Sequence, residues 1–524
     1  MSVDRRALLQ GGAALAAAGF PLPGIVSAQP QFKADPFTLG IASGEPASDG
    51  FVIWTRLAPE PFTVRGGMTL LPVEVQWDIA ADPSMQQIVR SGTATARIEV
   101  AHAVHIEASG LEPARDYFYR FRAGNAESPV GRTRTLPAPG AEVAELRFAS
   151  AGCQRWEDGF YTAWRRLAEE NFDFVIHYGD YIYEQPYRAN WPNGQPVARP
   201  MPRDQGGCFT LPDYRRRYAL YKSDPDLKAA HASCPFVASF DDHEVFDNWA
   251  NDHDAKNTPP QIFLFRRAAA FQAWYEHMPV RASMIPRGPD MLAYRALRIG
   301  TLADITVLDT RQYRSPQACG DGFKICPDAD DPARTMLGEA QERWLGERLR
   351  AAGSTWQVLA QQVLFAQLDF SQFEWVVEKA PGARNLDAWD GVSAARKRVM
   401  DMLREARATN PVVLTGDAHM GMALELKEDW NDPASKCSAV EFLAPSISSN
   451  GDGAPTVTND EAIRRLNPHL RHLGNERGYA RHTVTPKQWQ ADYRALERIT
   501  TPDAPVFTRT SFVVEGGNPG LSRA

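Results

Sequence analysis

Five short apolar segments of this chain are each followed directly by a group of polar or ionisable residues. The first two segments cover residues 146–150 and 174–178, and an amphipathic segment over residues 159–170 separates them. This order predicts two neighbouring parallel strands connected by a helix. The later segments end at Phe240, Leu308 and Leu414. Because the functional sites of open α/β sheets lie at the carboxyl ends of their strands, we expect the polar groups to meet in one site.

The polar residues at these strand ends are of kinds that bind metal ions and phosphate. Carboxylates suit hard cations, thiolates and imidazoles suit transition metals, and an arginine donates paired hydrogen bonds to phosphate. Taken singly, each has an ordinary structural explanation, such as a turn at a Gly-Asp pair or a buried thiol. Their coincidence at successive strand ends favours a metal site. The candidates are Cys153, Asp180, Tyr183, Asp242, His243, Asn248, Arg311, Asp417 and His419.

Residues 37–138 are predicted to form a small all-β domain. Apolar and polar residues alternate in several segments of this region, and turn residues separate them. The pattern Leu-x-Pro-x-x-x-Tyr over residues 111–117 is typical of a fibronectin-III-like sandwich, with Tyr117 as a tyrosine corner. A segment rich in Pro and Gly, residues 135–140, predicts a linker. The following residues, 141–524, are expected to form one α/β domain.

The first 28 residues are predicted to be a twin-arginine signal peptide. Arg5 and Arg6 precede an apolar run rich in Ala and Gly, and small residues precede a cleavage point after Ala28. A general secretory signal with a chance Arg pair is the alternative. Either signal predicts a periplasmic or secreted protein, and the first makes the twin-arginine export machinery a partner. In an oxidising compartment Cys319 and Cys326 can pair, which the sequence leaves open.

The composition limits the other partners of the chain. A formal net charge of −7 and the lack of a long basic run argue against specific binding of nucleic acid. The apolar run of the signal is short and interrupted by prolines, and no other segment approaches the ~20 apolar residues of a membrane span. We therefore expect no stable membrane span, and we expect a monomer.

As a set, the motifs resemble those of the PhoD-type alkaline phosphatases. They are Cys153, Gly-Asp-Tyr-Ile-Tyr over 179–183, Asp-Asp-His-Glu-Val over 241–245 and Gly-Asp-Ala-His over 416–419. Residues 213–227, 387–391, 446–449 and 475–479 also resemble family signatures, although Gly152 stands where the family often has Ser. The resemblance implies a calcineurin-like metallophosphoesterase core, an α/β fold of β-sandwich sheets flanked by helices, preceded by a fibronectin-III-like domain.

The resemblance also implies iron together with calcium and a role for each candidate residue. By motif, Fe³⁺ is held by Cys153, Asp180, Tyr183 and His419. Asp180 bridges to Ca²⁺, which Asp242 and Asp417 also hold, with Asn248 nearby. His243 and Arg311 meet the phosphate of the substrate.

These roles imply hydrolysis of phosphate monoesters by a metal-activated hydroxide. In this hypothesis His243 stabilises or protonates the leaving group, and Arg311 offsets negative charge on phosphate. Phosphodiesterase or phospholipase D-type activity at the same site is an alternative. A non-catalytic binding module is a different class of function, which the intact ligand set argues against. A single-zinc hydrolase is disfavoured because the sequence has no His-Glu-x-x-His helix.

Overall fold

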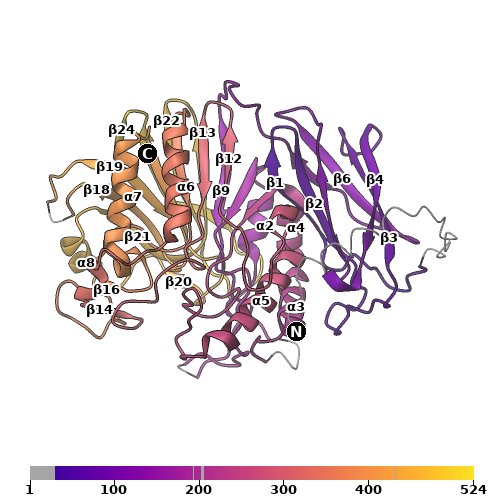
Figure 1. The fold of residues 1–524 in the computed structure, drawn as a ribbon, viewed down its shortest axis with the longest axis horizontal. Helices are drawn as coiled ribbons and strands as arrows, with labels where there is room; N and C mark the ends of the chain where they lie inside the picture. Colours follow the sequence, from indigo (N-terminus) through magenta and orange to yellow (C-terminus); the bar gives the residue numbers. More distant parts are fainter. Residues whose placement is uncertain (1–29, 193, 202–205, 431) are drawn as a thin grey trace, which may run out of the picture.

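The computed structural model describes residues 30–192, 194–201, 206–430 and 432–524 (Figure 1). The signal peptide predicted over residues 1–28 lies outside this part of the chain. Within the described residues, no helix has the length and apolar character needed to cross a membrane.

Two large sheets form the centre of the molecule. The order of the first is β24-β23-β22-β21-β9-β10-β11-β1-β2-β5, in which β9, β10, β11 and β1 run parallel. Phe174 lies opposite Phe148, so the two neighbouring parallel strands predicted around the first helix are confirmed. The strands of this first sheet are β1 (Ile41–Ala47), β2 (Gly50–Arg56), β5 (Ala103–Ala108), β9 (Leu146–Ala151), β10 (Phe174–His177), β11 (Phe236–Ala238), β21 (Leu470–Val484), β22 (Gln488–Leu496), β23 (Val506–Glu515) and β24 (Asn518–Arg523).

The second sheet has the order β12-β13-β15-β17-β19-β18-β21, with β13, β15, β17 and β19 parallel. The long strand β21 therefore belongs to both sheets. Its start pairs with β18, and its end pairs with β9 and β22. The further strands here are β12 (Arg295–Ile299), β13 (Ala303–Val307), β15 (Trp356–Ala360), β17 (Pro411–Thr415), β18 (Gly421–Lys427), β19 (Cys437–Leu443) and β20 (Gly453–Ala454), which pairs with the middle of β21.

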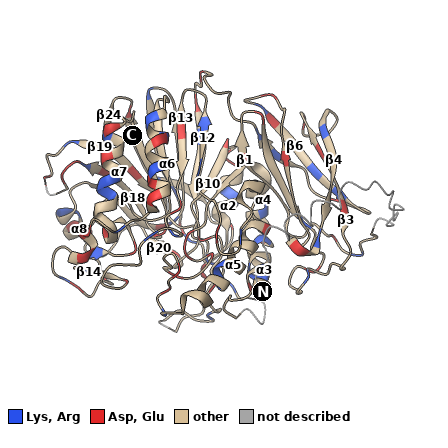
Figure 2. Ribbon diagram, viewed as in Figure 1, with Lys and Arg blue, Asp and Glu red and all other residues tan. Residues whose placement is uncertain are grey.

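Helices cover the outer face of each sheet, and the inner faces pack on each other. A buried core that includes Phe148, Trp356 and Phe442 fills the space between the sheets. The first sheet packs against α2 (Thr162–Ala168), α3 (Leu211–Lys222), α4 (Pro225–Ser233) and α5 (Pro260–His277). The second sheet packs against α6 (Gly338–Ala351), α7 (Ser393–Glu405) and α8 (Asp460–Leu466). Figure 2 shows basic and acidic residues interleaved on α6 and α7, as expected of helices with one face in water.

The connections between these elements contain a small hairpin and short 3-10 helices. The hairpin pairs β14 (Phe323–Lys324) with β16 (Arg384–Asn385), and it contributes to the site described below. The 3-10 helices are Ile98–Val100, Trp156–Asp158, Ala282–Met284, Pro327–Asp330 and Trp389–Val392.

The N-terminal region adds a third sheet and shares strands with the first. In the third sheet β4 (Ile88–Ala96), β3 (Val73–Ala80) and β6 (Asp116–Ala123) are neighbours, and β6 also pairs with β7 (Ala126–Glu127) and β8 (Gly131–Arg134). The Tyr117 hydroxyl accepts a hydrogen bond from the Glu112 N–H at 3.0 Å, which is the bond predicted for a tyrosine corner.

The third sheet packs on β1, β2 and β5, which extend the first large sheet. Gly44 of β1 lies opposite Phe236 of β11, and a Cβ at Gly44 would lie 2.6 Å from the Phe236 carbonyl oxygen. The region predicted as a separate domain over residues 37–138 is thus joined to the rest of the molecule by a continuous sheet, because this glycine allows two strands to approach.

Candidate metal centre and its cavity

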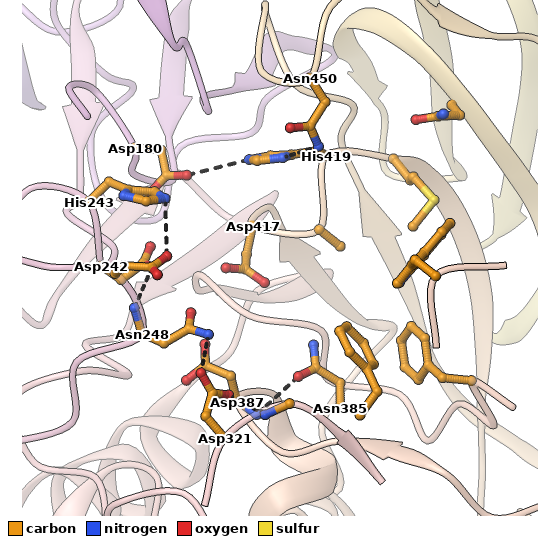
Figure 3. A pocket seen from close by; sticks show the side chains of 18 of the residues that line it. Asp180, Asp242, His243, Asn248, Asp321, Asn385, Asp387, Asp417, His419 and Asn450 are labelled. Carbon is orange, nitrogen blue, oxygen red and sulfur yellow. Dashed lines mark hydrogen bonds and ion pairs between the residues drawn. The ribbon is translucent and has the colours of Figure 1, made fainter. Parts of the chain in front are cut away.

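The carboxyl ends of β9, β10, β11 and β17 meet at one edge of the two sheets and bring the predicted metal ligands together. Figure 3 shows Asp180, Asp242, Asp417 and His419 around one cavity. In the described part of the chain, three groups of side chains each have ligand atoms within 4.8 Å of one another. Asp180 belongs to two of the groups, and so does Asp242. This sharing is the arrangement that two adjacent metal ions require. The groups are Cys153 with Asp180 and His419, Asp180 with Asp242 and His243, and Asp241 with Asp242 and Asp417.

Tyr183 lies at the centre of the first group. Its hydroxyl donates to Asp180 Oδ2 at 2.8 Å and lies 2.9 Å from His419 Nε2. On the other side of the His419 ring, the amide nitrogen of Asn450 lies 2.9 Å from Nδ1. An outer contact of this kind fixes the orientation of an imidazole that binds a metal. The side chains predicted to hold iron therefore converge on one point.

Oxygen atoms dominate the opposite side of the site. Asp242 accepts a hydrogen bond from the Asn248 backbone N–H at 2.8 Å. The side-chain amide of Asn248 donates to Asp321 at 2.7 Å, which holds the Asn248 side chain at the edge of the site. Asp417 completes this side, and its nearest cluster partners are carboxylates. Carboxylate and amide oxygens are the ligands that calcium prefers.

His243 is held beside the shared carboxylates. Its Nδ1 lies 2.8 Å from Glu184 Oε2, and its ring lies 4.0 Å from the Tyr183 ring, measured between centroids. Burial opposes protonation of this imidazole, but the carboxylates of Asp242, Glu184 and Asp180 raise its pKa well above the ordinary value. The imidazole is thus suited to carry a proton in the site.

Arg311 occupies a different position from the one predicted for it. The prediction placed its guanidinium against the phosphate of the substrate. The structure buries the side chain fully, with Nε donating to Asp241 at 2.6 Å and Nη1 donating to Asp387 at 2.8 Å. Its Nη2 lies 3.4 Å from Asp417. We therefore revise its role, because the guanidinium is fully buried behind four carboxylates, with Asp242 the fourth at 3.8 Å from Nη2, and it is not a lining residue of the cavity.

The electrostatics of the site indicate that cations belong in it. Burial and the neighbouring Asp242 raise the pKa of Asp180 well above its ordinary value, and burial and Asp241 do the same for Asp417. Burial, Asp180 and Asp417 raise the pKa of the Cys153 thiol. Asp180 Oδ1 is buried and has no hydrogen-bond partner among the residues that the structure describes. Metal ions would relieve both the repulsion and the unsatisfied oxygen, so the residues present fit a metal pair.

The backbone at the ligand positions is unusual. Cys153, Asp180, Asn248, Asp417 and His419 all have φ between 50° and 65°. Residues with side chains seldom adopt this left-handed region, and such strain gathers at functional sites. The sharp turns direct several side chains from separate strand ends toward the same point.

Tyr178 supports two of these turns. A Cβ at Gly152 would lie 2.5 Å from the Tyr178 ring, and a Cβ at Gly416 would lie 1.9 Å from it. The ring therefore packs against the backbone just before Cys153 and just before Asp417. With the ring in this position, a side chain at residue 152 would clash with it.

A cavity of about 500 Å³ opens over the metal ligands. Sequence reasoning missed several residues of its wall, although residues 387–391 and 475–479 had been noted as family signatures. Arg477 is one of them, and its Nη1 donates to the His419 carbonyl at 2.6 Å. The lining residues without a predicted role include Asp247, Asp321, Phe323, Phe370, Trp375, Asn385, Asp387, Met420, Asn450, Asn475 and Arg477.

One loop of the cavity wall is closed by a disulfide bond between Cys319 and Cys326, the pairing that the sequence left open. The loop contributes Asp321, Gly322 and Phe323 to the lining. Its position could not be read from the sequence, because the loop is far along the chain from every ligand that it contacts.

Comparison with known proteins gives consistent matches over the chain. Residues 148–493 match the family model described as PhoD-like phosphatase, and residues 24–137 match the model of the N-terminal domain of PhoD-like phosphatase. Alkaline phosphatase D of Bacillus subtilis (strain 168) is 45% identical over 530 residues, which is 99% of this chain and 89% of that protein. The solved structure of PhoD matches with a TM-score of 0.90 and 46% identity, covering 94% of this chain and 93% of that one.

Proposed function

This chain belongs to the PhoD-like phosphatase family, and from that premise we propose that it hydrolyses phosphate monoesters outside the cytoplasm with bound Fe³⁺ and Ca²⁺. Family membership makes it a phosphoester hydrolase. The observation that carries the proposal is the sharing of Asp180 and Asp242 among the three ligand groups, because phosphoryl transfer in metal-dependent hydrolases uses two adjacent cations.

We assign the ligands by their chemistry. The thiol, phenol and imidazole of Cys153, Tyr183 and His419 suit iron, with Asp180 as the shared carboxylate. The oxygens of Asp242, Asp417 and Asn248 suit calcium. When bound, the two ions would supply an activated water and stabilise negative charge on the phosphate oxygens.

The other side chains bind the ester and handle its proton. Glu184 accepts the Nδ1 proton of His243, so the proton available to the departing alcohol oxygen is on Nε2. Arg477 lines the cavity, and its three hydrogen bonds leave two of its five N–H groups for phosphate. Arg311 acts as a positioning residue that holds Asp241, Asp387 and Asp417 in place.

Export is proposed from the Arg pair at the start of the chain, and the disulfide supports it. Disulfide bonds persist in oxidising compartments and are rare in the cytosol. Replacing Arg5 and Arg6 by Lys should leave an active, uncleaved protein in the cytoplasm if the twin-arginine pathway is used. Unchanged export of that variant would indicate the general secretory pathway.

The test of the proposed activity combines metal analysis with two substrates. We expect about one iron per chain, and calcium-dependent hydrolysis of p-nitrophenyl phosphate. Bis(p-nitrophenyl) phosphate should be a poorer substrate, and the opposite order would show a phosphodiesterase.

A thiol variant and its control assign the iron. Cys153→Ala should lose the iron and the activity. Cys234→Ala, which removes another buried thiol outside the ligand groups, should retain both. Full activity in Cys153→Ala would rule out the assignment of the iron ligands.

A further inference from the structure

Aromatic side chains form one side of the cavity. We call Phe323, Phe370 and Trp375 the aromatic wall, and all three line the cavity. The rings of Phe323 and Phe370 lie 4.9 Å apart, measured between centroids. Phe373 lies beneath the wall and connects Phe370 with Trp375, since its ring lies 4.9 Å from each of theirs. The wall is therefore one contiguous surface built from two separate loops.

The foundation of the wall is fixed, while its outer member is open to solvent. Phe373 is fully buried and Phe370 is 2% exposed, and both belong to the core beneath the second sheet. Trp375 is 51% exposed. A large aromatic side chain at the edge of a cavity offers apolar surface that a ligand in the cavity can cover.

The wall is continuous with the metal ligands. Phe323 of β14 lies opposite Asn385 of β16, and both line the cavity. Asp321, two residues before Phe323, accepts the side-chain hydrogen bond of Asn248. Figure 3 shows Asn248, Asp321, Asp387 and Asn385 following one another from the metal ligands along one side of the cavity. A molecule that extends from the metal site in this direction reaches the aromatic wall.

We propose that the aromatic wall binds the alcohol part of the phosphate ester and selects esters of planar, apolar alcohols over esters of small, hydrophilic ones. The proposal rests on the proposed function, which places the phosphate at the metal ligands. A planar ring on the wall removes apolar surface from water and stacks on Trp375. A small polyol gains nothing there, because the rings offer no hydrogen bonds in exchange for those with water.

The test compares two esters in one variant. In Trp375→Ala we expect kcat/KM for 1-naphthyl phosphate to fall about tenfold and kcat/KM for glycerol 3-phosphate to change less than about twofold. Each ester is compared with itself in the unmodified protein, so differences in leaving-group reactivity cancel. Trp375→Phe should recover most of the loss. Val377→Ala is the matched control, because Val377 is 94% exposed and is not a lining residue.

Two further measurements distinguish an effect on binding at the aromatic wall from an effect on the metal site. Inhibition by inorganic phosphate should be unchanged in Trp375→Ala, since phosphate occupies the metal end. An equal loss of kcat/KM for both esters, or weaker inhibition by phosphate, would overturn the proposal. If the unmodified protein hydrolyses neither ester, the proposed function fails. The wall is then still tested by calorimetry with 1-naphthyl phosphonate, which should bind the unmodified protein more tightly than it binds Trp375→Ala.

Discussion

At the scale of single residues, the sharp backbone turns that precede Cys153 and Asp417 depend on the space that a neighbouring side chain occupies. Tyr178 fills the space beside Gly152 and Gly416, so a Cβ at either position would require the ring or the turn to move. The sequence predicted ligands at these strand ends because an Asp or Cys after a buried strand is conspicuous. It could not predict the contact with Tyr178, because that contact depends on how three strand ends pack together.

The first prediction concerns Gly416. Gly416→Ala places a methyl group 1.9 Å from a Tyr178 ring carbon, so the turn that carries Asp417 and His419 must move. We expect a loss of about 1–3 kcal/mol in the free energy of unfolding, together with lower metal content and activity. Gly353→Ala is the control, because a Cβ there meets no atom within 4 Å. Thermal melting and metal analysis check both variants, and normal metal content in Gly416→Ala would contradict the argument.

The second prediction concerns Lys222, a buried lysine at the end of α3. Its ammonium lies 4.2 Å from the centroid of the Trp54 ring, and burial lowers its pKa from 10.5 to about 7. Between these two values the unfolded chain binds more protons than the folded one. The free energy of unfolding should therefore rise with pH across this window, by at most ~1.4 kcal/mol per pH unit from this group.

Chemical denaturation at pH 7, 8 and 9 measures this slope. Lys222→Met should flatten it and should stabilise the protein at pH 7, since a charged group no longer has to be buried. Lys33→Met, at an exposed position, is the control and should leave the slope as it is. The same slope in Lys222→Met as in the unmodified protein would show that another group titrates.

At the scale of secondary-structure elements, the strands of the central sheets were the most predictable part. Buried parallel strands are continuous apolar runs, and β9, β10 and β17 each lie where such a run stands in the sequence. Loops carry no such signal. The hairpin of β14 and β16 and the aromatic wall lie in segments whose apolar residues have no helical or strand periodicity. The role proposed for Phe323 and Trp375 could therefore not be predicted from the sequence.

The third prediction concerns the loop closed by Cys319 and Cys326. The bond holds Asp321 against Asn248 and Phe323 against Phe370. Replacing both cysteines by serine should raise KM and weaken the affinity for calcium severalfold, because Asn248 loses its fixed partner. Calcium titration of the activity measures this effect, and the iron content should stay the same, since Asp321 holds Asn248, which is a proposed calcium ligand and not an iron ligand.

At the scale of the whole molecule, the N-terminal region is joined to the rest of the protein by side-chain contacts and by the pairing of β1 with β11. The Trp54 indole N–H donates to the Glu276 carbonyl at 3.0 Å, and Arg295 forms an ion pair with Glu45. The sequence predicted a separate domain because residues 135–140 have the composition of a linker. It could not show that β1 pairs with β11, because strand pairing between distant segments leaves no local signal.

The fourth prediction follows from this continuity. Residues 141–524 expressed alone would expose the edge of β11 and the surfaces that pack on β1, β2 and Trp54, and this fragment should aggregate. Coexpression with residues 30–140 should restore a soluble, active complex that elutes as one species in gel filtration. A soluble and active fragment of residues 141–524 would show that the two parts are independent.

The position of β21 near the end of the chain also determines how late in translation the two sheets can be joined. Residues 480–484 pair with 146–150, and Arg477 reaches the cavity from the same strand. A ribosome that has made the first 469 residues has therefore made every proposed metal ligand, but not the strand that joins the two sheets. The finished protein depends on contacts across more than 300 residues of chain, which is slow to achieve. Translation must reach its last tenth before the metal site can close.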